Sequence, residues 1–292
     1  MPEKQRKIMT VLLAVIFAVS TALLIRNGFD AATSEEANAA AAEIAAQPRE
    51  TAPTAEPVQP EPEETVPAEP VPTEPPMEWV AAPVEEDEYI KLMKDINLAA
   101  LREKNPDVVG WIFAPNCRIN YPIVQGDDNQ YYLNHTWDNR RSVAGSIFME
   151  STNSPDFSEF RTILYGHNMA DLSMFGSLHR YESPVSRAGS PYVYVVTDEG
   201  VLRYEIYSVY KAEVESGTYA LNLEEEAYRA AFINLTKEES LYEIDITPAV
   251  TDRILTLSTC AGNASVRRVV HARLPMIQVE MKTDSPQSED LQ

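Results

Sequence analysis

Cysteine and glycine are scarce in this chain of 292 residues, which contains two cysteines and 10 glycines. Two cysteines exclude a disulfide-stapled scaffold and a zinc site built from several thiolates. Lysine and arginine are also few, 24 against 45 aspartates and glutamates, so a basic surface for phosphate backbones is absent and no nucleic-acid partner is predicted. The four histidines lack the HxxxH and HExxH spacings. The sequence therefore predicts neither a metal site nor a cofactor.

The acidic residues and prolines gather in one part of the chain. Residues 27–90 hold 16 acidic residues against Arg49 as the only base, and 11 of the 21 prolines lie between Pro48 and Pro83. A segment of this composition cannot bury enough apolar surface to offset the entropy of ordering. We expect residues 26–88 to form a disordered stalk rich in Ala, Pro and Glu, with Ala31–Ala46 partly helical. A second disordered segment is expected at residues 282–292.

One long apolar run precedes this stalk. Residues 8–25 carry no charge, and as a helix they would cover about 27 Å, close to the thickness of a bilayer core. Cations precede the run at Lys4, Arg6 and Lys7, which predicts a cytoplasmic tail at residues 1–7 and the chain after the run outside the cell. The alternative is a cleaved secretory signal, but its apolar region is typically shorter, about 7–15 residues. We predict a single-pass membrane anchor.

Residues 89–281 have the pattern of one folded domain. Helical spacing of apolar residues begins at Tyr89 and stops at Asn105-Pro106, and a second helical pattern covers Leu223–Leu235. Short runs of β type dominate the rest, and Asp198-Glu199-Gly200 reads as a hairpin turn. The runs are Val108–Phe113, Ile119–Val124, Gly145–Met149, Thr162–Tyr165, Tyr192–Thr197, Val201–Val209, Ile254–Ser258 and Val266–Leu274. We predict a mainly β fold of the α+β type, closed or nearly closed into a barrel.

Three side chains of this domain stand where chemistry is possible. Cys260 ends a β run and precedes a loop, a position that holds a nucleophile rigidly yet leaves it accessible. His167 also follows a β run, beside Gly166, which we expect to permit a sharp turn. If the last two β runs are neighbours, Arg267 or Arg268 can reach the thiol, lower its pKa from about 8.5 and stabilise an oxyanion.

The other cysteine and histidines are assigned structural roles. Cys117 lies in a short connection and is expected to be an inert, buried thiol, not a disulfide partner of Cys260. His179 is placed in a short helix and His271 in the last β run, where both are expected to serve structure or surface. The sequence around His135 does not assign it a role.

This constellation resembles the sortases, and in its details class B. The resemblance covers Asp87 to Leu274, and LYGHNM followed by LTLSTC is its most specific part. The motifs that carry it are NPDVVGWI (Asn105–Ile112), INYPIVQ (Ile119–Gln125), DNQYYL (Asp128–Leu133), AGSIFME (Ala144–Glu150), LYGHNM (Leu164–Met169) and LTLSTC (Leu255–Cys260). It implies an eight-stranded sortase barrel with an N-terminal helix and a helix between late strands, tethered outside the cell by the N-terminus.

The resemblance also implies the roles of individual residues. Cys260 is the nucleophile, His167 the general acid and base, and an arginine of the last strand the oxyanion partner: Arg267, with Arg268 as the alternative. Substrate contacts carry over to Ser258, Asn129 and Leu133.

The implied activity is that of an extracytoplasmic cysteine transpeptidase. It would cleave the C-terminal sorting signal of a secreted protein and transfer the acyl group to an amine of a peptidoglycan precursor or cross-bridge. The alternatives are a pilin-polymerising sortase, a secreted cysteine peptidase that uses water, and a wall-associated binding domain with an inert cysteine. An L,D-transpeptidase is disfavoured because Cys260 follows Ser258-Thr259 instead of a Ser-His-Gly motif.

Overall fold

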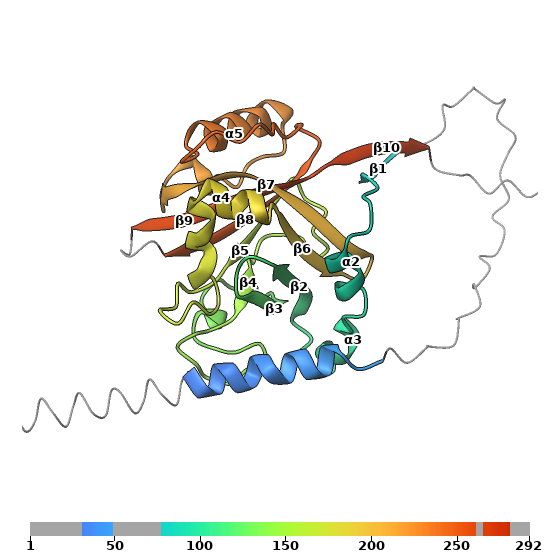
Figure 1. Cartoon of the computed structure of the whole chain (residues 1–292), viewed down its shortest axis with the longest axis vertical. Helices are drawn as coiled ribbons and strands as arrows, with labels where there is room; N and C mark the ends of the chain where they lie inside the picture. Colours follow the sequence, from blue (N-terminus) through green and yellow to red (C-terminus); the bar gives the residue numbers. More distant parts are fainter. Residues whose placement is uncertain (1–30, 49–76, 261–264, 281–292) are drawn as a thin grey trace, which may run out of the picture.

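Eight strands close into a barrel in the computed structural model, which describes residues 31–48, 77–260 and 265–280 (Figure 1). The order around the barrel is β2-β3-β4-β5-β8-β9-β7-β6, so the predicted barrel is confirmed. The strands are β2 Val108–Ala114, β3 Ile119–Val124, β4 Ile147–Met149, β5 Arg161–Tyr165, β6 Tyr192–Thr197, β7 Gly200–Glu213, β8 Arg253–Cys260 and β9 Val266–Leu274. Pairing is antiparallel except between β3 and β4 and between β5 and β8.

Turn chemistry and alternating apolar residues explain these strands. Gly200 has a φ of +138°, a conformation that favours glycine, and it closes the predicted hairpin between β6 and β7. In β8 and β9, alternate residues such as Leu257 and Val270 point into the barrel core. The residues between them, such as Val269, face outward and pack against Tyr210 of β7 and Tyr219.

Two short helices replace the single helix predicted before Asn105. α2 (Glu88–Met93) is capped by Asp87, and α3 (Leu98–Arg102) is capped by Asn97, whose side chain accepts a hydrogen bond from the Ala100 amide. This second cap, invisible to a count of apolar spacing, divides the predicted helix. The other helical segments of the barrel domain are η1 Tyr131–Leu133, η2 Gly176–Glu182, α4 Pro184–Gly189, η3 Gly217–Tyr219 and α5 Glu226–Glu238.

Helix α5 and the preceding η3 cover the outer face of β7, β8 and β9. α5 begins three residues later than the prediction of Leu223–Leu235, and it buries Phe232, Ile233 and Thr236. Phe232 packs with Tyr207 of β7 and Ile254 of β8 in one apolar cluster. The helix between late strands is therefore confirmed, and it forms a second layer over one side of the barrel (Figure 1).

The predicted stalk, residues 26–88, contains ordered segments where disorder was expected; the helix predicted in part at Ala31–Ala46 is confirmed, but it is packed and not part of a solvated stalk. Residues 31–45 form a helix that lies along the barrel domain, with Ala37, Ala41 and Ala45 fully buried (Figure 1). The indole of Trp137 donates a hydrogen bond to the Ala37 carbonyl at 2.7 Å. Small side chains spaced along one face allow this close approach, and alanine itself favours the helix.

The other end of the predicted stalk is a strand. β1 (Met77–Ala81) pairs antiparallel with β10 (Met276–Glu280), and the two form a separate two-stranded sheet. Partners from distant parts of the chain order each other here, which local composition does not reveal.

Several predicted segments lie outside the described residues. These are the tail at residues 1–7, the anchor at residues 8–25, the middle of the stalk at 49–76 and the C-terminal segment at 282–292. Among the helices of the described ranges, none is both long and apolar enough to span a bilayer.

Candidate active site

The parallel pairing of β5 with β8 brings the His167 and Cys260 segments together. Tyr165 is the register partner of Ser258, and each is followed two residues later by one of the two predicted catalytic residues. The Gly166 amide donates to the Ser258 carbonyl at 3.3 Å, which continues the pairing beyond β5. His167 and the backbone of Cys260 therefore occupy the same end of neighbouring strands; the Cys260 side chain lies outside the described residues.

Gly166 serves close packing, not the sharp turn predicted for it. A Cβ at this position would stand 2.5 Å from Cδ1 of Ile147 and 3.0 Å from the ring of Phe175. Both distances are shorter than an ordinary contact, so a side chain here would push the His167 loop away from the barrel. The Phe175 amide donates to the His167 carbonyl at 3.0 Å and fixes the same loop from its far side.

The ring of His167 is oriented by a backbone carbonyl. Its Nε2 lies 2.7 Å from the carbonyl oxygen of Leu133, the last residue of η1. A carbonyl oxygen only accepts, so Nε2 carries a hydrogen and Nδ1 is the nitrogen left to take up or release a proton. Leu133, predicted as a substrate contact, therefore contributes through its backbone to the orientation of His167.

Arg267 and Arg268 have different partners in the sheet. Arg267 is the register partner of Cys260 across β8 and β9, whereas Arg268 is the partner of Thr259. Residues opposite one another in an antiparallel pair share a face, and successive residues alternate between faces.

Arg268 lies on the barrel-interior face and is already engaged. It is 8% exposed, and its Nε donates to Oε1 of Glu182 in η2 at 2.6 Å. Lys211 stands 3.8 Å from the same carboxylate oxygen. Of the two arginines, Arg267 is thus the one that shares a ladder position with Cys260.

Asn129 belongs to a polar cluster around a buried carboxylate. Its Nδ2 donates to Oε1 of Glu150 at 2.6 Å, and its Oδ1 accepts from the Ser151 amide at 2.9 Å. Tyr165 donates its hydroxyl to the other Glu150 oxygen at 2.9 Å. Burial and the neighbouring Glu150 charge raise the pKa of Tyr165, so the phenol stays protonated.

Ser258 is covered by a tyrosine from another element. It is 1% exposed, and its Oγ lies 2.8 Å from the hydroxyl of Tyr219 at the end of η3. The Tyr219 hydroxyl therefore covers Ser258, the residue predicted to contact the substrate. Together Tyr165, Tyr219 and Arg267 surround the strand ends on the outer face of the barrel.

Three residues of this region were not singled out from the sequence: Glu150, Tyr165 and Tyr219. Glu150 and Tyr165 lie inside the motifs AGSIFME and LYGHNM, where an acid and a tyrosine at strand ends were available signals. Tyr219 stands in a segment without any local pattern, and only the fold brings it to Ser258.

Cys117, His179 and His271 have the structural settings expected of them, and His135, which was assigned no role, lies on an aromatic ring. Cys117 is a free, buried thiol whose pKa is raised to about 11 by burial. His271 is fully buried in β9, and His179 lies in η2 with Nδ1 at 2.8 Å from the Gly176 carbonyl oxygen. His135 stacks on Tyr131 with ring centroids 4.0 Å apart.

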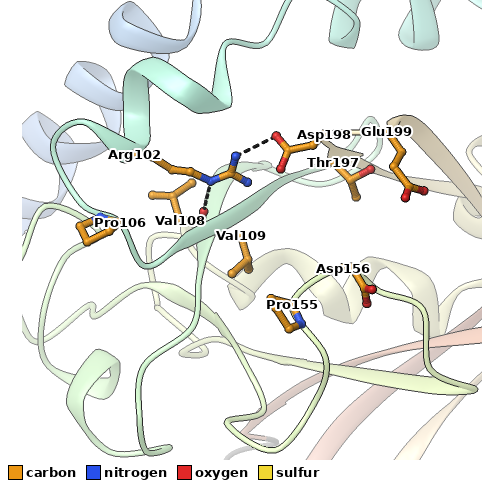
Figure 2. Close-up of a pocket in the computed structure, with 9 residues that line it drawn as sticks. All are labelled: Arg102, Pro106, Val108, Val109, Pro155, Asp156, Thr197, Asp198 and Glu199. Carbon is orange, nitrogen blue, oxygen red and sulfur yellow. Dashed lines mark hydrogen bonds and ion pairs between the residues drawn. The ribbon is translucent and has the colours of Figure 1, made fainter. Parts of the chain in front are cut away.

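Within the described residues, neither the cavity beside α3 nor any group of metal-binding side chains points to a second centre. Arg102 lines a cavity of about 390 Å³. It donates to the Val108 carbonyl and to Asp198 (Figure 2), both at 2.7 Å. The walls of the cavity come from α3, β2, the β6–β7 turn and the loop after β4, away from the end of β8. Across the described part of the chain, no three His, Cys, Asp or Glu residues are grouped to hold a metal ion.

The fold and the strand ends define a barrel enzyme with a cysteine, a histidine and an arginine, and comparison with known proteins gives the family. The family model "Sortase domain" matches residues 112–275, more than half of the chain. The chain belongs to the sortase family of cysteine transpeptidases, and its relatives place it in class B.

Three relatives illustrate the match. Sortase B of Listeria monocytogenes is 36% identical over 166 residues, which are 56% of this chain and 66% of that protein. Sortase B of Staphylococcus aureus is 32% identical over 173 residues, or 59% of this chain and 71% of that protein. A solved Staphylococcus aureus sortase B–substrate complex superposes with a TM-score of 0.58 at 32% identity, over 62% of this chain and 85% of the other. The chain thus spans about two thirds of the length of these two sequence relatives.

Proposed function

We propose that this protein is an extracytoplasmic transpeptidase that cleaves the C-terminal sorting signal of secreted proteins and joins them to a peptidoglycan amine. The observation that carries the proposal is the register of three strands: Tyr165 of β5 pairs with Ser258 of β8, which places His167 and Cys260 each two residues further on, and β9 sets Arg267 opposite Cys260. The Staphylococcus aureus relative has been solved as a substrate complex, which supports a peptide substrate here.

In the first half of the reaction the Cys260 thiolate attacks the carbonyl carbon of the scissile peptide bond. The guanidinium of Arg267 donates hydrogen bonds to the developing oxyanion. His167 protonates the leaving amine from Nδ1, because Nε2 is held by the Leu133 carbonyl. The C-terminal fragment departs, and the substrate remains as a thioester on Cys260.

In the second half an amine of a peptidoglycan precursor or cross-bridge attacks the thioester. Nδ1 of His167 accepts the proton of the amine, the thiolate leaves, and a new amide bond forms without ATP. Water in place of the amine would make the protein a peptidase, and a pilin lysine would make it a pilus polymerase.

We also propose that residues 8–25 anchor the protein in the cell membrane, with residues 1–7 cytoplasmic and the barrel on the wall side. The support is the length of the uncharged run and the cations that precede it. Protease protection of intact cells tests this orientation: added protease should digest the barrel domain, and a barrel protected until lysis contradicts it.

Product analysis separates transfer from hydrolysis. The full chain is incubated with a panel of peptides bearing Pro-x-Thr-like motifs, with and without triglycine. The masses of the products are then measured by mass spectrometry. Transfer predicts a triglycine adduct, whereas hydrolysis under both conditions favours the peptidase. Cys260→Ala should abolish cleavage and the covalent intermediate, while Cys117→Ala serves as the matched thiol control and should retain activity. Cleavage by Cys260→Ala would remove Cys260 from the mechanism.

A further inference from the structure

A buried arginine outside the catalytic group ties η3 to the barrel. Arg161, the first residue of β5, is 5% exposed. Its Nη1 donates to the Thr218 carbonyl at 2.7 Å, and its Nη2 donates to the Ala220 carbonyl at 2.5 Å. These two carbonyls lie on either side of Tyr219. The guanidinium therefore holds the backbone that carries this tyrosine.

A second attachment reaches the same segment from the other strands. The Thr218 hydroxyl is 2.8 Å from the hydroxyl of Tyr210 in β7, which is 3.2 Å from Nε2 of His271 in β9. Nδ1 of His271 is 3.0 Å from the Thr256 hydroxyl in β8. Thr218, His271 and Thr256 are almost completely buried, so this chain of hydrogen bonds is shielded from water.

The segment held in this way reaches the active site through one side chain. The Tyr219 hydroxyl stands 2.8 Å from Oγ of Ser258, two residues before Cys260 and opposite Tyr165 in the register. Tyr219 also packs against Val269 and Ala212, beside the ladder position of Arg267. A shift of η3 would therefore displace the wall of the site without touching the catalytic residues.

Burial of the Arg161 guanidinium carries a desolvation cost that a purely structural residue need not have. Taking a guanidinium out of water requires compensation, and an apolar side chain of similar length is often as stable in such a place. Burial lowers the pKa of Arg161. What an apolar residue cannot do is donate to two backbone carbonyls at once and so fix the direction of a three-residue helix.

We propose that Arg161 is a positioning residue for the peptide substrate: it clamps η3 so that Tyr219 forms a fixed wall over Ser258 beside Cys260. This inference rests on the proposed function, because it assigns the wall to the binding of the peptide. It implies that loss of Arg161 weakens peptide binding far more than it slows the chemical step.

A double-mutant cycle tests whether Arg161 acts through Tyr219. Arg161→Met and Tyr219→Ala are each expected to raise KM for a cleaved peptide about tenfold, with kcat within about threefold of the parent. The double variant should lie within about twofold of the worse single variant. The proposal would be overturned if the KM increases of the two single variants multiply in the double variant, or if Arg161→Met has the same KM as the parent.

Arg229 provides the matched control. It too is an arginine of this region, with Nε 2.9 Å from the Leu223 carbonyl oxygen and its guanidinium over the Phe160 ring, but this carbonyl lies outside η3. Arg229→Met is expected to leave KM within about twofold of the parent. A KM increase equal to that of Arg161→Met would assign the effect to general loosening and contradict a specific clamp.

Hydrogen exchange measured by mass spectrometry tests whether Arg161 holds η3, and it does so independently of catalytic activity. In Arg161→Met, amides of residues 214–222 should exchange at least tenfold faster, while those of β8 and β9 keep the parent rates. Unchanged exchange in this segment overturns the clamp even if KM rises. If the parent cleaves no peptide, the proposed function fails. Faster exchange in Arg161→Met would then show that the clamp has a structural role only, and its role in substrate binding would be overturned.

Discussion

Adjacent residues of one strand have different partners, as Arg267 and Arg268 illustrate. The sequence indicated both arginines as candidate oxyanion partners. It did not choose between them, because their spacings to Cys260 differ by a single residue. The choice depends on register, and register is set by pairing across the whole sheet. Arg268, with Glu182 as its ion-pair partner, belongs to the barrel interior.

Alanine substitutions should separate the two arginines. Arg267→Ala is expected to lower kcat/KM by about 100-fold or more, because the oxyanion loses its charged donor. Arg268→Ala should act mainly on stability, by about 1–3 kcal/mol, because it leaves the Glu182 carboxylate without its closest cation. Peptide cleavage kinetics and urea unfolding measure the two effects. Equal losses of kcat/KM in the two variants would contradict the assignment from the register.

The buried His271 predicts a stability that depends on pH. Burial, with a smaller effect of the Arg161 charge, lowers its pKa from 6.5 to about 3, so the ring is neutral in the folded protein. The unfolded chain binds a proton at this residue below about pH 6.5, whereas the folded chain does so only near pH 3. This contribution to stability is therefore complete above pH 6.5 and is lost as the pH falls toward 3, at up to about 1.4 kcal/mol per unit.

Replacing the histidine tests that dependence. In His271→Gln the free energy of unfolding should fall less steeply between about pH 6.5 and pH 4 than in the parent, because glutamine does not titrate. Urea unfolding at several pH values, followed by fluorescence, gives both slopes. Parallel slopes would mean that His271 does not contribute, and His135→Gln provides a control at a histidine outside the buried chain of hydrogen bonds.

At the scale of elements, local pattern predicted the strands well and the boundaries of the ordered domain poorly. β3, β6 and β9 begin and end where the apolar runs predicted, since both faces of these strands exclude water over much of their length. The helix at residues 31–45 has alanine where a packed helix usually has larger apolar residues, so its composition resembles that of the stalk. Its order depends on Trp137, 100 residues away in the chain.

A pair of charged substitutions tests the docking of this helix. Ala41 is fully buried, and its neighbour Ala42 is exposed. Ala41→Glu should destabilise the protein by about 2–4 kcal/mol or detach the helix, because a carboxylate would enter an apolar contact. Ala42→Glu, with the same charge and the same helix propensity, should change stability by less than about 0.5 kcal/mol. Differential scanning fluorimetry gives the comparison, and similar melting temperatures would contradict the observed packing.

At the scale of the whole molecule, the candidate site lies at one end of the barrel, and the connection from β9 to the β1–β10 sheet lies at the other. β9 begins beside the site at Val266 and ends at Leu274, a strand of nine residues that spans about 27 Å. β10 follows directly and pairs with β1. Sequence motifs predicted the barrel, and its register brings the candidate residues His167 and Cys260 to neighbouring strand ends. The β1–β10 sheet could not be predicted because each strand is stable only with its distant partner.

Removal of β10 should separate stability from activity. A chain ended after Pro275 loses the β1 partner and the buried Met276. We expect its free energy of unfolding to be about 1–3 kcal/mol lower than that of the parent. Its kcat/KM should stay within about threefold of the parent, because the site lies at the far end of β9. A chain ended after Met281 is the control and should match the parent in both measurements. A large loss of kcat/KM in the shorter chain alone would contradict this separation.

The pairing of Met77 with Glu280 has a consequence for engineering. The first residue of β1 lies opposite the last residue of β10, so a fluorescent protein or affinity label joined after Glu280 would start beside Met77. This position follows the end of β9 at Leu274, whereas Cys260 is paired with Arg267 near the start of β9. Labels can thus be added there without crowding the approach of large protein substrates.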